Sequence, residues 1–386
     1  MKKHILCIGD SNTHGFCTDP SESADRGGRY NEEERWTCLL QKALGDEYLV
    51  IEEGLSGRTC VYDDPAMDSV NLLPVFHALL NTHEPVDLLI LMLGTNDAKS
   101  KFGTDAKKIA LGMQILVEDA KTVPCWGAAG PKILVVAPVP IEEGVTYEDF
   151  NAESVKATRG LAREYAFLAV REGVGFLDAG GCELTSVDHV HLTRKGHRQL
   201  AERMETAVKE IIDMEQKEKV VQEPNGGEIV PAIEEELPRI LEIYDIAKAY
   251  MRSSGNPNQW NGAYPDPELL KEDIRKQRLY VIKKDGRIHG VFMLLLEEEP
   301  TYAYIEDGSW REGETPYGTI HRLAGDGEVK GLFSHCVTFC QSKVKYLRAD
   351  THFDNHTMQH LLEKNGFERR GIIYLKNGDP RIAYQK

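Results

Sequence analysis

Residues 5–13 read Ile-Leu-Cys-Ile-Gly-Asp-Ser-Asn-Thr, a short apolar run that leads directly into a polar turn with a serine at position 11. An apolar run of this kind, bounded by turn residues, indicates a strand buried on both faces, as in a parallel sheet. In open α/β folds, ligands bind beyond the carboxyl ends of such strands, which is where Ser11 follows. The segment therefore predicts an α/β sheet with Ser11 at its functional edge.

Outward from this segment, short β-rich runs alternate with longer helical stretches as far as residue 213. This alternation predicts a parallel sheet whose strands are joined by crossover helices. The predicted strands are residues 5–8, 48–52, 86–93, 132–137 and 175–178, and the predicted helices are residues 35–44, 105–120, 151–172 and 193–213.

Residues 214–227 differ in character, because Glu, Lys and Gln dominate and the segment ends in Pro-Asn-Gly-Gly. Such a stretch is typical of a linker. We therefore expect one domain over residues 1–213 and a second, mixed α+β domain over residues 228–386. In the second domain we expect strands at 229–232, 319–324 and 347–352, helices at 237–251 and 358–364, and a hairpin of 279–283 with 289–296 around Asp285-Gly286.

The bulk properties exclude several classes of protein. A chain of 386 residues exceeds one ordinary core, and 41% hydrophobic and 28% charged residues are typical of globular proteins. The net charge of -16 argues against nucleic-acid and anionic-membrane partners. The N-terminal apolar run is too short for a secretory signal, and no stretch is long enough to span a membrane. We expect a cytoplasmic protein, with homo-oligomerisation left open.

The eight cysteines show no paired metal-ligand spacing, so reduced thiols and no metal site are expected. His335, Cys336 and Cys340 fall close together on a predicted helix. No second ligand pair accompanies them, which favours core packing over metal binding.

Residues 188–191 read Asp-His-Val-His and lie just before the last helix of the first domain. A serine nucleophile needs an imidazole to accept its proton and a carboxylate to fix and stabilise that imidazole. We assign Asp188 and His191 to these roles, because an Asp-x-x-His spacing lets one loop present both groups. His189 is the competing base.

Two further segments follow predicted strands and supply hydrogen-bond donors. Residues 93–97 read Leu-Gly-Thr-Asn-Asp, and residues 53–58 read Glu-Gly-Leu-Ser-Gly-Arg. Acyl transfer places negative charge on a carbonyl oxygen, which preorganised donors stabilise. The Asn96 side chain and the backbone N–H groups of Ser11 and Gly57 are the predicted oxyanion hole.

At these residues the first domain resembles the SGNH, or GDSL-type, hydrolase family, whose four blocks are matched in order by Gly-Asp-Ser, Gly57, Gly-x-Asn-Asp and Asp-x-x-His. It looks closest to the arylesterase and acetylesterase branch. The resemblance implies a flavodoxin-like three-layer α/β/α fold and hydrolysis of short-chain acyl esters through an acyl-serine intermediate, with no cofactor or metal. It also implies that Trp36 and Arg58 lie near the substrate.

In the second domain, a Gly-rich turn over residues 325–332 lies between a predicted strand and a helix. Unpaired backbone N–H groups at a helix start can hold a pyrophosphate, although such a turn is more often only a turn. A second helix, opened by Asn355 and closed by Asn-Gly-Phe, follows the next strand.

Residues 228–386 thereby resemble the GNAT acyltransferase family, which implies acetyl-CoA as co-substrate. The resemblance implies that Lys330, Gly331 and Leu332 hold the coenzyme A pyrophosphate and that Asn355 holds the pantetheine arm. The turn departs from the family pattern, and Leu362 replaces a tyrosine that protonates the leaving thiolate in many members. The resemblance implies acetyl-CoA binding and acyl transfer to an amine. The missing tyrosine at Leu362 favours the alternative, a non-catalytic acyl-CoA-binding or dimerisation module.

Overall fold

The computed structural model describes residues 2–213, 227–260 and 264–386. The chain divides into two compact units, Met1–Val220 and Val221–Lys386. The predicted linker, residues 214–227, lies outside the described residues except for Gly227. Among the helices that the structure describes, none combines the length and the apolar character needed to cross a membrane.

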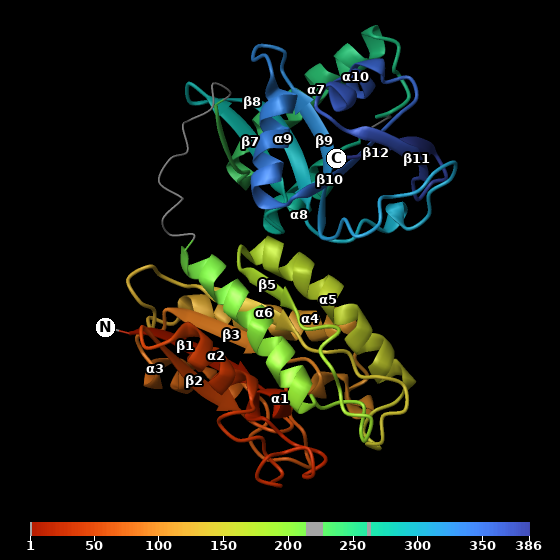
Figure 1. Ribbon diagram of the computed structural model, residues 1–386. Coiled ribbons are helices and arrows are strands. Elements are labelled where there is room, and N and C mark those ends of the chain that lie inside the picture. The colour runs from red at the N-terminus through yellow and green to blue at the C-terminus, as the bar shows by residue number, and fades with distance from the viewer. Residues whose placement is uncertain (1, 214–226, 261–263) are drawn as a thin grey trace. The chain divides into compact units, whose positions relative to one another are not determined.

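The first unit is built on a parallel five-stranded sheet with strand order β2-β1-β3-β4-β5 (Figure 1). This is the doubly wound order of flavodoxin-like folds. Every residue of β3 and β4 is buried, as expected for strands covered on both faces. The strands are β1 (Lys3–Gly9), β2 (Tyr48–Gly54), β3 (Leu88–Met92), β4 (Ile133–Ala137) and β5 (Gly175–Asp178).

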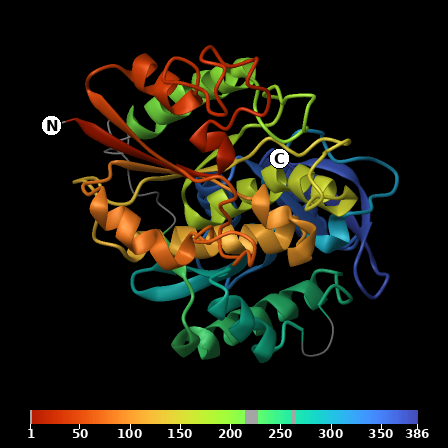
Figure 2. The ribbon, with the colours of Figure 1, turned by 90° about the horizontal axis from the view of Figure 1, so that it is seen from below.

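Helices cover both faces of this sheet (Figure 2). One apolar cluster joins the sheet to α2 and α6, and the other joins it to α3, α4 and α5. This arrangement confirms the predicted three-layer α/β/α fold. The helices are α1 (Ser11–His14), α2 (Trp36–Leu44), α3 (Phe76–Thr82), α4 (Ala106–Thr122), α5 (Ala152–Glu172) and α6 (Arg194–Asp213), with 3-10 turns at η1 (Leu73–Val75), η2 (Asn96–Ala98) and η3 (Ser100–Phe102).

Side-chain caps set the starts of three long helices. Asp105 and Asn151 cap α4 and α5, and the Thr193 hydroxyl accepts a bond from the Gly196 N–H at the start of α6. These three predicted helix starts therefore agree with the structure to within one residue. The short helix α3 was not predicted.

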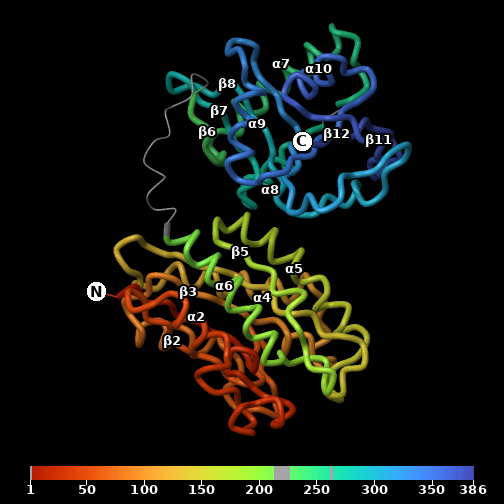
Figure 3. Tube along the Cα trace, in the orientation of Figure 1, coloured from red at the N-terminus to blue at the C-terminus, as the bar shows by residue number. Residues whose placement is uncertain are grey.

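Between α1 and α2 the chain makes an irregular excursion over residues 15–35 (Figure 3). Gly15 ends α1 with a φ of +83°, in the left-handed region that favours glycine. The excursion then pairs Phe16 with Arg29 in an isolated antiparallel bridge. Residues just after Ser11 are thereby held in a fixed loop.

The second unit contains a mixed seven-stranded sheet with order β11-β12-β10-β9-β8-β7-β6. The strands are β6 (Glu228–Pro231), β7 (Leu279–Lys284), β8 (Arg287–Leu295), β9 (Tyr317–Gly325), β10 (Tyr346–Thr351), β11 (Glu368–Tyr374) and β12 (Pro380–Gln385). The hairpin of β7 and β8 turns at Asp285 and Gly286, both with positive φ, as the Asp-Gly dipeptide predicts.

Helices pack around this sheet and complete the predicted α+β fold. Helix α7 contacts β8 and β9, whereas α9 contacts β8, β9 and β10. The helix α8 was not predicted. The helices are α7 (Leu237–Ser253), α8 (Pro267–Arg275), α9 (Leu332–Lys343) and α10 (His356–Lys364), with 3-10 turns at η5 (Glu234–Glu236) and η6 (Pro300–Tyr302).

Candidate active site

Three neighbouring strands end at the predicted hydrolase site. Ser11 follows β1, Gly57 follows β2 and Asn96 follows β3, and these strands are adjacent in the order β2-β1-β3. Because carboxyl ends of parallel strands share one edge of a sheet, the three residues gather at that edge. Topology thus explains why segments far apart in the sequence meet.

The loop that carries the imidazole is fastened to the start of the chain by Asn12. Its Oδ1 accepts a bond from the Leu192 N–H at 2.9 Å, and its Nδ2 donates to the Val190 carbonyl at 3.3 Å. These bonds bridge residues 178 and 180 positions apart. Asn12 therefore holds the His191 loop beside Ser11, a function that the sequence did not reveal.

Ser11, His191 and Asp188 form a continuous hydrogen-bonded chain. Ser11 Oγ lies 2.9 Å from His191 Nε2, and His191 Nδ1 lies 2.6 Å from Asp188 Oδ2. Ser11 and His191 are each 7% exposed. This is the nucleophile–base–carboxylate arrangement that acyl transfer requires.

Asp188 is surrounded by donors. Its Oδ1 accepts the backbone N–H groups of Val190 at 2.9 Å and His191 at 3.0 Å, and its Oδ2 also accepts the Thr18 hydroxyl. Burial would raise the pKa of Asp188, but its hydrogen bonds from His191 and Thr18 outweigh burial and hold that pKa well below its usual range. The carboxylate therefore stays charged at neutral pH.

The competing imidazole, His189, turns away from this chain. Its φ is +62°, and its Nδ1 lies 3.2 Å from Glu142 Oε2. Its side chain is 27% exposed, against 8% for His191. Of the two candidates, the structure places His191 beside Ser11.

Two of the three predicted oxyanion donors, Gly57 and Asn96, lie on loops that are joined to each other. Asn96 Nδ2 donates to the Arg58 carbonyl at 3.2 Å, which leaves its second N–H to point elsewhere. Gly57 has a φ of +85°, so a side chain there would be strained. Asp97 strengthens the junction by accepting the Cys60 N–H at 2.9 Å, and burial raises the pKa of this carboxyl to about 7.

Trp36 and Arg58, which the resemblance puts near the substrate, are engaged with the protein itself. Trp36 is completely buried in the cluster between the sheet, α2 and α6. Arg58 is 6% exposed, and its Nη1 donates to the carbonyls of Glu53 and Gly9 at the ends of β2 and β1. These contacts give Trp36 a packing role and Arg58 a role in joining two strand ends.

In the second unit, the parallel strands β9 and β10 diverge. Their pairing runs from Tyr317 with Tyr346 to Ile320 with Ala349 and ends there. His321 is the next residue of β9, and its Nε2 lies 3.1 Å from Glu299 Oε2. We call the part of β9 and β10 beyond Ile320 and Ala349 the fork.

Burial would raise the pKa of Glu299, but its bonds from His321 and Thr301 outweigh burial and lower that pKa to about 2. His321 Nδ1 faces Asp350 Oδ1 of β10 at 3.8 Å. The fork thus holds an imidazole between two carboxylates.

The residues predicted to hold coenzyme A fall into two groups. Lys330 is exposed, Gly331 precedes α9 with a φ of +79°, and the Leu332 side chain packs over the backbone of β8 and β9. Asn355 caps α10 by accepting the Met358 N–H at 3.0 Å, and its Nδ2 donates to Gln259 Oε1 at 2.7 Å. Leu362 is completely buried.

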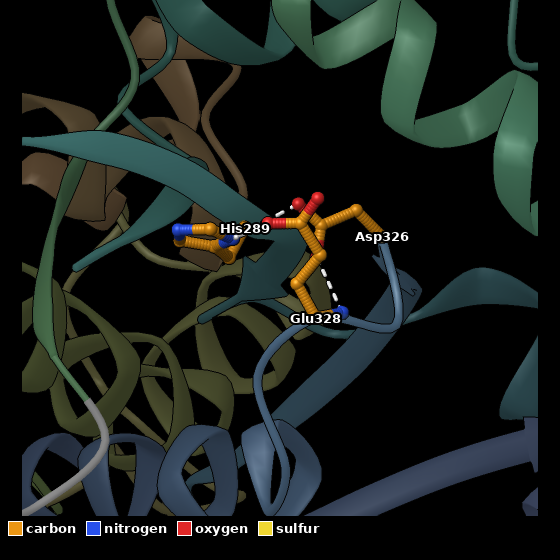
Figure 4. A group of neighbouring side chains, drawn as sticks. All are labelled: His289, Asp326 and Glu328. Carbon is orange, nitrogen blue, oxygen red and sulfur yellow. Dashed lines mark hydrogen bonds and ion pairs between the residues drawn. The ribbon is translucent and has the colours of Figure 1, made fainter. Parts of the chain in front are cut away.

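An ion cluster fixes the turn before α9 (Figure 4). Asp326 Oδ2 lies 2.9 Å from His289 Nδ1 and 2.7 Å from Arg239 Nη2, and Glu328 Oε2 lies 3.7 Å from His289 Nδ1. These three acidic and imidazole groups are close enough to ligate a cation, but the Arg239 guanidinium already occupies the Asp326 oxygen. We assign the cluster to holding the turn.

The cysteines and His335 also have structural surroundings. All eight cysteines are free. His335 Nε2 bonds the Gly227 carbonyl at 2.8 Å, while Cys336 and Cys340 are completely buried with their sulfur atoms 3.9 Å apart. This agrees with the packing role that the sequence indicates.

Comparison with curated proteins found no match. Residues 228–386 were predicted to be GNAT-like, and the chain is similar to an acetyltransferase of the GNAT family from Streptococcus agalactiae 2603. The identity is 30% over 42% of this chain and 95% of that protein, with a TM-score of 0.39.

Solved esterases are similar to this chain as well. A carbohydrate acetylesterase family member from Sinorhizobium meliloti is 35% identical over 55% of this chain and 99% of that protein, with a TM-score of 0.50. The aryl esterase of M. smegmatis is 37% identical over 54% of this chain and 99% of that protein, with a TM-score of 0.49.

The model of the GDSL-like Lipase/Acylhydrolase family matches residues 7–199, which include Ser11, Gly57, Asn96, Asp188 and His191. This match confirms the resemblance drawn from the four sequence blocks. The chain belongs to the GDSL-like lipase and acylhydrolase family.

Proposed function

We propose that the first unit hydrolyses short-chain acyl esters, acetyl esters among them, through an acyl-serine intermediate on Ser11. Membership of a family of lipases and acylhydrolases indicates carboxylic ester hydrolysis as the reaction class. The similar acetylesterase supports a short acyl group. The single observation that carries the proposal is the hydrogen-bonded chain from Ser11 through His191 to Asp188.

In this mechanism Ser11 Oγ attacks the ester carbonyl carbon and its proton passes to His191 Nε2. Asp188 stabilises the imidazolium that forms, since its carboxylate accepts the Nδ1 proton. The oxyanion receives hydrogen bonds from the backbone N–H groups of Ser11 and Gly57 and from Asn96 Nδ2. His191 then protonates the departing alcohol, and a water molecule hydrolyses the acyl-serine by the same route.

Two aromatic rings flank the catalytic imidazole. The Phe16 ring centroid lies 4.6 Å from that of His191. The Tyr147 ring packs edge-on against the same imidazole, with the ring centroids 5.9 Å apart. Apolar walls of this kind exclude water and strengthen the electrostatic interactions between the reacting groups. We propose that these rings border the path of the alcohol.

Hydrolysis of an aryl acetate by the intact chain tests the proposal. We expect Ser11→Ala to lower kcat by on the order of 10⁴-fold or more while the melting temperature stays near that of the unchanged protein. Thr206→Val, on the exposed surface of α6, is the matched control and keeps full activity. Undiminished hydrolysis by Ser11→Ala would remove Ser11 from its role.

For the second unit we propose acetyl-CoA binding and transfer of the acetyl group to an amine. The observation that favours it is the fork, where His321 is held by Glu299 beside the diverging strands. An imidazole held in this way can accept the proton that an amine loses as it attacks a thioester. The alternative is an esterase whose second unit binds acyl-CoA, or dimerises, without catalysis.

The predicted pyrophosphate turn carries acidic side chains that weigh against tight binding. Glu328 is 69% exposed near the turn, and Asp326 is paired with Arg239. Because coenzyme A is anionic, Lys330 and the backbone of Gly331 and Leu332 must overcome this local negative charge. We therefore expect affinity in the micromolar range or weaker.

Calorimetric titration of the intact chain with acetyl-CoA tests whether the second unit binds acetyl-CoA, as both acetyl transfer and a non-catalytic acyl-CoA-binding module require. Asn355→Ala removes both the α10 cap and the amide that we propose contacts the pantetheine arm, so we expect weaker binding. Binding without acetylation of a panel of primary amines would favour the non-catalytic module. Absence of binding would contradict both and leave a structural or dimerising role.

The two units are thus proposed as separate domains, residues 1–213 and 228–386, with separate acyl chemistry. We propose a cytoplasmic location, since all eight thiols are free and the cytoplasm keeps thiols reduced.

A further inference from the structure

The Asp188 carboxylate is held by more groups than an imidazole alone. Oδ1 accepts two backbone N–H groups of its own loop, whereas Oδ2 accepts His191 Nδ1 and the Thr18 hydroxyl. Thr18 lies 170 residues away in the sequence. It is therefore the side chain that connects the loop after Ser11 to the carboxylate.

Thr18 contacts the imidazole as well as the carboxylate. Its Oγ1 lies 3.3 Å from His191 Nδ1, the nitrogen that faces Asp188. The single Thr18 proton points to Asp188, so its oxygen lone pairs face the Nδ1 proton. A hydroxyl in this position favours the ring orientation that presents Nε2 to Ser11.

The backbone around Thr18 is fixed by its neighbours. Phe16 pairs with Arg29, the Cys17 N–H donates to the Gly28 carbonyl at 3.0 Å, and Cys17 Sγ contacts the Asp19 carbonyl at 3.0 Å. Thr18 is only partly exposed. Its hydroxyl is thus held in place by the loop and not by the triad alone.

We propose that Thr18 is a positioning residue of the hydrolase: its hydroxyl orients the Asp188 carboxylate and the His191 ring for proton transfer from Ser11. This inference rests on the proposed ester hydrolysis and adds a residue outside the matched sequence blocks. Thr18 acts through Asp188 and His191 and is assigned no contact with the substrate.

The charge state of Asp188 depends on the same contacts. The titratable groups that face Asp188 are His191 and, at 3.4 Å, the Tyr147 hydroxyl. The Thr18 bond is among the interactions that lower the pKa of Asp188. Removal of the Thr18 hydroxyl is therefore expected to raise the pKa of Asp188 toward its ordinary value.

The test measures kcat and KM for an aryl acetate from pH 4 to 9, with the intact chain and rates normalised by active-site titration. We expect Thr18→Val, which keeps the shape and removes the hydroxyl, to lower kcat roughly tenfold to a hundredfold with KM within about threefold. Thr18→Ser restores the hydroxyl and is expected to recover kcat to within about threefold of the unchanged protein.

Two further variants keep the proposal open to refutation. Thr18→Cys carries a weak donor, so its kcat should lie between those of Thr18→Val and Thr18→Ser. This variant also tests the role of the hydroxyl if Thr18→Val does not fold. Tyr147→Phe removes the longer bond to Asp188 and should cost less than Thr18→Val.

The inference is overturned if Thr18→Val has full activity, if Thr18→Ser is as slow as Thr18→Val, or if the cysteine and serine variants are equal. Ser11→Ala, measured in the same series, separates the test of the proposed ester hydrolysis from the test of the Thr18 role. An active Ser11→Ala would overturn the proposed function, whereas an active Thr18→Val beside an inactive Ser11→Ala would overturn the role of Thr18 alone.

Discussion

Each unit of the molecule holds an imidazole against a carboxylate, but the two pairs differ in what lies on the other nitrogen. In the first unit, His191 bonds Asp188 through Nδ1 and Ser11 through Nε2. In the second, His321 bonds Glu299 through Nε2, and its Nδ1 faces Asp350 at 3.8 Å. On the other nitrogen, the first pair has the Ser11 hydroxyl, whereas the second faces the Asp350 carboxylate.

The group that faces the second nitrogen of each imidazole therefore determines which reaction the pair can support. A resident hydroxyl beside the base supports covalent catalysis, in which the acyl group is held on the protein. A base without one can act only on a nucleophile that arrives with the substrate. The proposed ester hydrolysis in the first unit and the proposed transfer to an external amine in the second therefore use the same kind of pair in two settings.

The largest expected effect is on the rate of ester hydrolysis, which should depend on His191 and not on His321. We expect His191→Ala to lower kcat for aryl acetate hydrolysis by on the order of 10⁴-fold, because Ser11 loses its base. His321→Ala, the matched variant in the second unit, should leave this hydrolysis unchanged. A comparable loss in both variants would show that the two imidazoles do not act separately.

A second comparison concerns buried carboxyl groups. Asp97 in the first unit accepts the Cys60 backbone N–H, whereas Asp273 in the second is paired with the Arg322 guanidinium. Burial raises the pKa of Asp97 from its ordinary value of 3.8 to about 7. Between these values the folded protein keeps a proton that the unfolded chain has lost, so the contribution of Asp97 to stability falls as pH rises.

Asp97→Asn tests this sign, since asparagine keeps the acceptor oxygen without a charge to bury. We expect the stability of the first unit to fall between about pH 4 and pH 7 by a few kcal/mol more in the unchanged protein than in the variant. Calorimetric melts at several pH values measure the difference. Parallel pH profiles for the two proteins would contradict it.

The next effect concerns the second unit alone. His321→Gln should lower the rate of amine acetylation from acetyl-CoA roughly a hundredfold, since the amine loses its base, while acetyl-CoA binding is unchanged. Rates come from thiol release and binding from calorimetry. Equal transfer rates in the two proteins would contradict the role of the fork.

The smallest expected effect on hydrolysis is that of replacing His189, the second imidazole of the catalytic loop in the first unit. His189→Gln should keep hydrolysis within about twofold, because His189 bonds Glu142 at the surface and not Ser11. A loss as large as that of His191→Ala would reverse the assignment between them.

Much of the fold follows from local pattern. The apolar runs before Ser11 and Asn96 and the run at residues 132–137 predict the parallel sheet, because such runs are typical of strands buried on both faces. Helices α3 and α8 escaped prediction, since each is short and lies in a stretch rich in turn residues. The predicted start of α5 lies within one residue of the observed start, where the Asn151 side chain caps the helix.

The site residues could be predicted only where both their side-chain chemistry and their position in the sequence indicate acyl transfer. Ser11, Asp188 and His191 carry the residue types that acyl transfer needs, in segments that follow strands or precede a helix. Thr18 and Asn12 contact the same loop from 170 and 180 positions away, and no local pattern in the sequence marks them. Trp36 and Arg58 show the converse, since the resemblance implies that they lie near the substrate, whereas Trp36 is buried and Arg58 is paired within the protein.

Ser11 is proposed to carry the acyl group, with His191 as its base. The most direct measurement is mass spectrometry of the intact chain after reaction with a serine-directed phosphonate ester, compared with His191→Ala and His321→Ala. We predict one adduct on the peptide that contains Ser11, formed at least a hundredfold more slowly in His191→Ala and at the usual rate in His321→Ala. An adduct on another residue, or equal labelling of all three proteins, would contradict the account.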